Sequence, residues 1–315
     1  MTKLKVAILY GGPSNEHDVS VSSARNVLSQ IDKDLYDVIE IPISKEGLFN
    51  INNQEYKTVE AITEIKKIAD IAFPVLHGKF GEDGAVQELL ERVGIPFVGS
   101  GSKASRIAIN KNISNTVFAK NNLSIPQSEV TTKNNFTVSV NFPVIVKPLD
   151  EGSSLGVHKC KSQEELNAVV EKAFIDHTEM LVQECVFGRE FTCGVLDIDG
   201  IPTPLPPSEI ILTGTGLFDY EAKYTPGACT EVTPAEIDDS LEEEIQDVVL
   251  QCHEILNCKS ISRTDVIVSK NGTIYILETN TLPGMTKTSF IPAQAKAFGL
   301  SMAELITTLI KSAHT

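Results

Sequence analysis

Short apolar runs separated by stretches of helical periodicity restrict the fold of this chain more than any other feature of its sequence. Each run is bounded by Gly, Pro or charged residues and is too short for a typical helix, which predicts buried strands. The runs are LKVAILY, AFPVLHG, FPVIVKP, MLVQECV and EFTCGVL. Between the first two, Ala24, Val27, Leu28 and Ile31 follow the spacing of an amphipathic helix. This alternation predicts an α/β or α+β fold in several layers.

Size and charge narrow the possible classes of protein. A chain of 315 residues is long enough for two or three domains. Its net charge of -15, the absence of Trp and the lack of a basic run disfavour a general nucleic-acid binder. No apolar stretch approaches the roughly 18 residues of a membrane span, and the N-terminal run is too short for a secretion signal. The six cysteines form no C-x-x-C pair, so we expect buried, reduced thiols in a cytoplasmic protein.

Two places in the sequence indicate domain boundaries. A Gly/Ser cluster at 99–102 follows the apolar run IPFV, and Gln183 and Glu184 lead into a third block. The segment 202–234 is rich in Pro, Gly and Thr, and such a long irregular stretch is typically disordered or a functional lid. We therefore predict three domains, at 1–99, 100–182 and 183–315.

The C-terminal third contains a strong hairpin signal. In SRTDVIVSKNGTIYILETN, residues 262–280, Asn271-Gly272 separates two β-rich runs and predicts a two-residue turn that pairs Lys270 with Thr273. Directly paired side chains lie on one face of a hairpin, and the face alternates along each strand. The register therefore brings four polar side chains to one face, with Asp265 directly opposite Glu278 and Arg263 directly opposite Asn280.

Two carboxylates in directly opposed positions repel each other. Both ionise at low cost when a cation lies between or above them. Asp, Glu and Asn supply the hard oxygen ligands that suit Mg²⁺ or Mn²⁺. The alternative is a solvated hairpin end in which Arg263 neutralises the pair, and the hairpin alone leaves both interpretations open. A Mg²⁺ ion with few protein ligands normally also binds phosphates.

A second motif, KPLDEGSSLGV, has the residue types of a phosphate-binding loop. It follows the predicted strand FPVIV, and its Gly and Ser residues let backbone N–H groups approach phosphate oxygens beside a lysine. The loop matches neither the GxxxxGK[ST] nor the GxGxxG pattern. Since Gly/Ser turns are common, the loop by itself is weak support for nucleotide binding.

Taken together, the motifs have a more specific meaning. LYGGPSNEHDVSVSSA, VLHGKFGEDGAVQELL, KPLDEGSSLGV, FDYEAKY, SRTDVIV and LETNTLPGMTKTSF occur in this order and span nearly the whole chain. Their combination resembles the D-alanine–D-alanine ligases of the ATP-grasp superfamily. The resemblance implies an N-terminal parallel-sheet α/β substrate-binding domain and ATP held between a central and a C-terminal α+β domain, the latter with the lid and the metal site.

The same resemblance implies a reaction. ATP would phosphorylate the carboxylate of a first D-alanine, and the amine of a second would attack the D-alanyl phosphate and expel phosphate. The dipeptide would serve peptidoglycan synthesis in the bacterial cell wall. We expect D-alanine and ATP as partners, Mg²⁺ or Mn²⁺ as metal, no nucleic acid, no membrane, and a homodimer.

The resemblance also implies ATP-binding and metal-binding residues. Lys111 and Lys147 would hold phosphates, the loop at Ser153 and Ser154 would close over them, and Lys223 would meet the γ-phosphate. Gln183 and Glu184 would bind adenine, and Glu190 the ribose. Asp265, Glu278 and Asn280 would hold two metal ions that bridge the phosphates, in agreement with the hairpin register.

Further residues would contact the amino acids. Glu16 would bind the ammonium of the first D-alanine, His77 its carboxylate, and Ser289 the carboxylate of the second. Phe290 stands where the family commonly has Leu and could narrow the second subsite. Arg263 and the Gly284 N–H would stabilise the acyl phosphate and the oxyanion. Tyr224 would bond with Ser153 and Glu16 to close the lid; outside the family, a Glu at a helix start and a lone His usually have structural roles.

Two other functions fit the same residues. A ligase of this fold could use D-serine or D-lactate as acceptor, although the lactate-using relatives resemble the family with His at the position of Tyr224. A different class is an ATP-binding module without catalytic activity. The presence of Arg263, Asp265, Glu278 and Asn280 argues against such a module.

Overall fold

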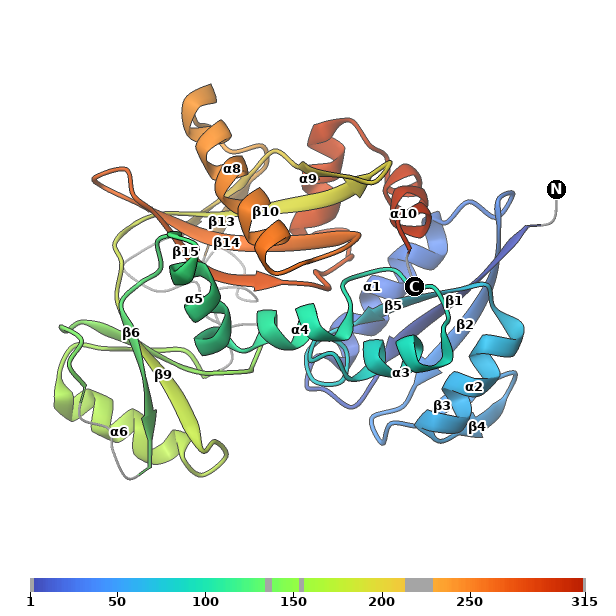
Figure 1. Cartoon of the computed structure of the whole chain (residues 1–315), viewed down its shortest axis with the longest axis horizontal. Helices are drawn as coiled ribbons and strands as arrows, with labels where there is room; N and C mark the ends of the chain where they lie inside the picture. Colours follow the sequence, from blue (N-terminus) through green and yellow to red (C-terminus); the bar gives the residue numbers. More distant parts are fainter. Residues whose placement is uncertain (1–2, 134–137, 153–155, 213–228, 314–315) are drawn as a thin grey trace.

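The computed structural model of the chain describes residues 3–133, 138–152, 156–212 and 229–313. Within these ranges the strands form three sheets. Figure 1 shows the N-terminal sheet and a four-stranded sheet at opposite sides of the molecule, with a larger C-terminal sheet beside both. The predicted site residues Ser153, Ser154, Lys223 and Tyr224 lie outside the described residues.

The N-terminal sheet has a parallel centre and an antiparallel edge. In the order β4-β3-β2-β1-β5, β1 pairs in parallel with both β2 and β5, whereas β3 pairs antiparallel with β2 and with β4. The predicted parallel sheet is therefore a mixed one, because a short hairpin extends it. The strands are β1 (Leu4–Gly11), β2 (Tyr36–Ile43), β3 (Phe49–Ile51), β4 (Gln54–Tyr56) and β5 (Ile71–Leu76).

Helices cover both faces of this sheet, which explains the unbroken apolar run of β1. α1 (His17–Gln30) packs on the face that carries Val6 and Ile8. α2 (Thr58–Ile68) and α3 (Ala85–Val93) pack on the opposite face, which carries Ala7 and Leu9.

The four-stranded sheet is antiparallel and has the order β6-β9-β7-β8. One helix, α6 (Gln163–Ala173), packs its Leu166 and Val170 against the sheet, and its N-cap Ser162 accepts a hydrogen bond from the Glu165 N–H. The sheet carries Lys147 near the end of β7. The strands are β6 (Ser128–Thr132), β7 (Val144–Pro148), β8 (His158–Cys160) and β9 (Glu179–Glu184).

The C-terminal sheet has six strands in the order β13-β12-β10-β14-β15, with β11 paired to β10. On one face, α8 (Asp239–Ile255) and α5 (Lys111–Lys120) enclose an apolar core, and α4 (Ser102–Ile109) precedes α5. On the other face, Gln294 of α9 (Phe290–Phe298) bonds to the backbone of β10. The strands are β10 (Gly188–Ile198), β11 (Ile201–Pro204), β12 (Ser208–Leu212), β13 (Cys229–Val232), β14 (Ile261–Ser269) and β15 (Ile274–Asn280).

Part of the segment 202–234 is regular, contrary to the expectation of an irregular stretch. β12, most of β11, and β13 fall inside it. Proline residues disfavour a strand prediction because they cannot donate a backbone hydrogen bond to a neighbouring strand. Proline is nevertheless tolerated in a short strand that makes few such bonds, as in β11.

One apolar core joins the N-terminal and C-terminal parts of the chain. Residues of β1 and α1 pack in the same cluster as Met285, Ile291 of α9 and Leu305 of α10 (Met302–Lys311). α1 therefore has a fixed position relative to the loop that precedes α9. The domain division at residues 99 and 182 stays a prediction. Within the described ranges, no helix has both the length and the apolar character that a membrane span requires.

Candidate active site

A cavity of about 510 Å³ lies between the N-terminal and C-terminal sheets. Its walls come from the start of α1, the loop after β5, the helices α4 and α5, the loop after β7, and the strands β13, β14 and β15. Residues from distant parts of the chain that were predicted for one site meet here. They are Glu16, His77, Lys111, Arg263, Asp265, Glu278, Asn280, Gly284, Ser289 and Phe290.

The β14–β15 hairpin has the predicted register at the site but not the predicted turn. Asp265 pairs with Glu278. The turn, however, has three residues rather than two, since Ser269 donates to the Thr273 carbonyl at 3.0 Å and Gly272 adopts a φ of +85°. Beyond the turn, the pairing shifts by one residue between Asp265 and Val266, which leaves Leu277 as the extra residue of a bulge. The extra residue in the turn and the extra residue in the bulge have opposite effects on the register, so Asp265 still pairs with Glu278. Both carboxylates face the cavity.

Cations already neutralise the two carboxylates. Arg263 makes a bidentate contact with Asp265, through Nε at 3.0 Å and Nη2 at 3.1 Å. The Lys111 ammonium lies 3.4 Å from Oε2 of Glu278 and donates to the Glu151 carbonyl at 2.7 Å. Burial opposes the charge of Arg263, but the facing carboxylates outweigh it and raise its pKa. The site is therefore a compact arrangement of alternating charges.

Lys147 is a buried cation next to this arrangement. Burial lowers the pKa of its ammonium to about 8, because the charged form loses its hydration. Glu278 opposes this decrease and the charge of Lys111 adds to it. Lys147 thus forms a poorly solvated positive charge that an additional anion would stabilise.

Glu16 approaches the two loops that border the cavity. A methyl group built on Gly78 would lie 2.8 Å from its Oε2, and one on Gly152 would lie 3.0 Å away. A larger residue at either glycine would force the Glu16 carboxylate to shift. The carboxylate of Glu16 therefore lies where the loop after β5 meets the start of the KPLDEGSSLGV loop.

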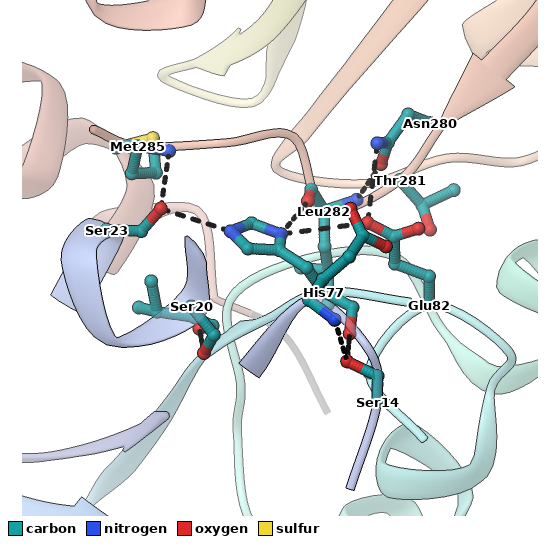
Figure 2. Close-up of polar contacts among 12 residues, drawn as sticks. Ser14, Ser20, Ser23, His77, Glu82, Asn280, Thr281, Leu282 and Met285 are labelled. Atoms are coloured by element: carbon teal, nitrogen blue, oxygen red, sulfur yellow. Dashed lines mark hydrogen bonds and ion pairs between the residues drawn. The ribbon is translucent and has the colours of Figure 1, made fainter. Parts of the chain in front are cut away.

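Figure 2 shows the polar contacts that hold the loop after β15. Asn280 donates to Glu82 at 3.4 Å, and its side-chain oxygen accepts from the Leu282 N–H at 2.8 Å. His77 Nδ1 lies 3.2 Å from the Leu282 carbonyl and 3.7 Å from Glu82. These contacts tie the predicted metal ligand Asn280 to the predicted substrate residue His77.

The far wall of the cavity comes from the start of α9. Ser289 is the N-cap of this helix and accepts from the Thr286 N–H at 3.0 Å. A methyl group on Gly284 would lie 2.8 Å from the Ser289 hydroxyl, so the backbone at this position is close to the serine. The Phe290 ring centre lies 5.9 Å from the guanidinium carbon of Arg263. This contact places an aromatic face against the central cation.

Four of the described residues predicted to bind ATP do not line the cavity, and the buried Lys147 is one of them. Gln183 and Glu184 lie at the end of β9, in the four-stranded sheet, and Glu184 Oε1 accepts from the Gln127 N–H at 2.9 Å. Glu190 lies in β10, paired with Ile210 and Ile267. Their roles stay predictions.

The donor set fits a metal that is shared with a phosphate. Among the described residues, no three His, Cys, Asp or Glu side chains gather into a metal site. Asp265, Glu278 and Asn280 nevertheless supply two carboxylates and an amide oxygen to one cavity, a set that suits Mg²⁺ or Mn²⁺. Since phosphate oxygens commonly complete the shell of Mg²⁺, these residues fit an ion that arrives with a nucleotide.

Sequence reasoning missed two residues of this site. Glu82 is buried and contacts both Asn280 and His77. It belongs to the quoted motif VLHGKFGEDGAVQELL, so the motif contained the signal. Ser23 is fully buried on α1 and contacts His77. It belongs to the quoted motif LYGGPSNEHDVSVSSA, whose several serines do not indicate which one contacts the site.

Known families match both parts of the chain. A family model described as D-ala D-ala ligase N-terminus matches residues 5–100, and one described as D-ala D-ala ligase C-terminus matches residues 111–311. The chain is 40% identical to the D-alanine–D-alanine ligase of Leptospira biflexa serovar Patoc, over 99% of this chain and 99% of the relative.

Solved structures agree with these matches. The VanG D-Ala:D-Ser ligase from Enterococcus faecalis superposes with a TM-score of 0.88 at 32% identity, and covers 98% of this chain and 99% of its own. The D-alanine–D-alanine ligase from Bacillus anthracis, complexed with ATP, superposes with a TM-score of 0.83 at 31% identity, over 99% and 97% of the two chains.

Proposed function

The chain belongs to the D-alanine–D-alanine ligase family of the ATP-grasp fold, and from this premise we infer that it joins two D-alanines at the expense of ATP. The product is D-alanyl-D-alanine, which serves peptidoglycan synthesis. The observation that carries this function is the arrangement of Arg263, Lys111 and the opposed pair Asp265–Glu278 in one cavity. It offers a place for phosphates beside cations and metal ligands.

We propose that this chain's own cations receive the phosphates of ATP. Lys111 already donates to the carbonyl of Glu151, at the start of the phosphate loop. Lys147 is buried, and this burial lowers the pKa of its ammonium. A phosphate that supplies negative charge would therefore bind the charged lysine strongly. Metal ions held by Asp265, Glu278 and Asn280, when bound, would neutralise charge on the transferring phosphoryl group.

The amino acids would bind at the other end of the cavity. We assign the ammonium of the first D-alanine to Glu16 and the carboxylate of the second to Ser289, which lies against Gly284. Arg263 and the Gly284 N–H would donate to oxygens that gain charge as the amine attacks the acyl phosphate. Loss of such a donor typically raises the barrier by about 3–4 kcal/mol.

A phosphate-release assay tests this function. The purified protein is incubated with ATP and Mg²⁺ together with D-alanine, L-alanine or no amino acid. Release that requires D-alanine, with dipeptide as product, is the expected result. Nucleotide binding without turnover would support the non-catalytic module instead.

The acceptor needs its own measurement, since a solved relative is a D-Ala:D-Ser ligase. We propose D-alanine as the acceptor, because the relatives at about 40% identity are D-alanine–D-alanine ligases. One hydroxyl group is hard to reject sterically, so D-serine is the closest competitor. Competition of D-alanine with D-serine and D-lactate at pH 6 and pH 8, with all products quantified, decides between them.

We further propose that the enzyme works in the cytoplasm as a homodimer. ATP is available in the cytoplasm, and all six cysteines are unpaired, as expected in a reducing compartment. Light scattering at several protein concentrations tests the dimer.

A further inference from the structure

The loop at residues 282–285 connects β15 to the segment that leads into α9. It starts two residues after the predicted metal ligand Asn280 and contains Gly284, the predicted oxyanion donor. Two of its residues, Leu282 and Met285, are buried. A small displacement of this loop would move Gly284 and would alter the hydrogen bond from the Leu282 N–H to the Asn280 side chain.

Hydrogen bonds join the two ends of this loop through α1 and the loop after β5 (Figure 2). The Met285 N–H donates to the Ser23 hydroxyl oxygen at 3.2 Å. The same hydroxyl lies 3.1 Å from Nε2 of His77, and Nδ1 of His77 lies 3.2 Å from the Leu282 carbonyl. The contacts thus run from Met285 through Ser23 and His77 back to Leu282.

The end groups fix the direction of the two outer bonds, and a neutral imidazole fixes the direction of the bond between Ser23 and His77. The Leu282 carbonyl can accept but not donate, so Nδ1 of His77 carries the proton. A neutral imidazole then has its lone pair on Nε2, which accepts the Ser23 hydroxyl proton. Ser23 keeps a lone pair for the Met285 N–H. All members are satisfied with a neutral His77, and both of its ring nitrogens have protein partners.

A second bond from α1 holds the same residue. Asn26 lies one turn after Ser23, on the same face of the helix, and its Nδ2 donates to the Met285 carbonyl at 2.8 Å. Ser23 and Asn26 thus hold both backbone groups of Met285. Since α1 shares its apolar core with Met285, this clamp connects the loop to a fixed element.

We propose that Ser23 is a positioning residue for the ligation reaction: through His77 and Met285 it holds the loop that presents Gly284 and orients Asn280. Ser23 does not line the cavity, so it acts through these partners. A hydrogen bond from His77 to a substrate carboxylate would have to replace its bond to Leu282, whereas the positioning role needs no such exchange. The proposal rests on the proposed function for its kinetic consequence.

The tautomer of His77 tests the hydrogen-bond circuit without any assay of activity. Histidine-selective ¹⁵N NMR of the free protein at neutral pH reports which ring nitrogen carries the proton. The chain has six histidines, and the signal lost in His77→Gln identifies residue 77. We expect a protonated Nδ1 in the wild type and a mixture of forms in Ser23→Ala. A wild-type His77 with its proton on Nε2 would overturn the circuit.

Kinetics test the positioning role against a matched control. Ser20 lies on the same helix, is equally buried, and bonds to the Gly11 N–H and the Val75 carbonyl instead of the loop. Ser23→Ala and Ser20→Ala should lower the melting temperature by similar amounts. In Ser23→Ala alone, kcat should fall about 3- to 10-fold, the effect of one lost hydrogen bond, with an unchanged KM for ATP.

The outcomes separate this proposal from the proposed function. Equal kcat values in the two variants would show that Ser23 is merely structural and would overturn the proposal. A wild-type protein without D-alanine-dependent phosphate release would instead overturn the function, and the NMR measurement would still decide whether the circuit exists.

Discussion

The carboxylate of Glu278 lies 3.4 Å from the ammonium of Lys111, and the two residues come from elements more than 160 positions apart in the chain. Glu278 also pairs directly with Asp265 across the hairpin. It therefore lies between a cation that can bind phosphate and a second carboxylate. Changes at Glu278 should affect metal and nucleotide together.

Glu278→Gln keeps the shape of the side chain but removes its charge. We expect kcat to fall by about 100-fold or more, because the weakened metal site misplaces the γ-phosphate, while ATP still binds weakly. Turnover is measured against Mg²⁺ concentration, with the exposed Glu254→Gln as control. Normal turnover of Glu278→Gln at ordinary Mg²⁺ concentration would remove the metal assignment.

The titration of Lys147 should make the free energy of unfolding depend on pH in the alkaline range. Burial holds its pKa at about 8 in the folded protein, against 10.5 in the unfolded chain. The unfolded chain therefore binds more protons between these values, and this group should raise the free energy of unfolding by roughly 3 kcal/mol as pH rises from 8 to 10.5. Below pH 8 its contribution is constant.

Chemical denaturation of metal-free protein at several pH values checks this effect. The difference between wild type and Lys147→Met isolates the contribution of the lysine, because other titrating groups are common to both proteins. Parallel pH profiles of the two proteins would show that Lys147 is not desolvated in the fold.

Phe290→Leu removes the aromatic face beside Arg263. A cation–π contact contributes about 1 kcal/mol, so kcat/KM for D-alanine should fall about five-fold, and the wider subsite should accept relatively more D-serine. Phe298→Leu is the matched control at the other end of α9, where the ring is 42% exposed. Equal kcat/KM values in both variants would contradict a role for Phe290 in the site.

The cysteines should react with thiol reagents in an order set by burial. Burial raises the pKa of the Cys258 thiol to about 12 and raises the pKa values of Cys193 and Cys252 further. We expect Cys185 and Cys229, which are half-buried, to be labelled first at pH 8. Rapid labelling of the four buried thiols, measured by mass spectrometry, would contradict the packed cores around them.

Local patterns predicted the strands and the hairpin register from sequence. Apolar runs identified β1, β5, β7, β9 and β10 because most positions of these strands are buried. The pairing of Asp265 with Glu278 was predicted correctly from a wrong turn, since the bulge at Leu277 compensates for the extra turn residue. A bulge depends on tertiary packing and has no local signal here.

Contacts between distant segments explain what the sequence could not predict. The bond between Ser23 and Met285 spans 262 positions, and that between Glu82 and Asn280 spans 198. A sequence separation of this size gives no indication that the two residues of either pair are in contact. The family resemblance predicted residues at the cavity, such as Glu16, but not the buried residues that hold them.

Transfer of oxygen from D-alanine to phosphate tests the central claim most directly. If ATP phosphorylates the carboxylate of the first D-alanine and the amine of the second expels phosphate, one carboxylate oxygen leaves with that phosphate. The protein is incubated with ATP, Mg²⁺ and D-alanine labelled with ¹⁸O in its carboxylate, and the released phosphate is analysed by mass spectrometry. The account predicts one ¹⁸O atom in the phosphate for each dipeptide formed; dipeptide accompanied by unlabelled phosphate would contradict it.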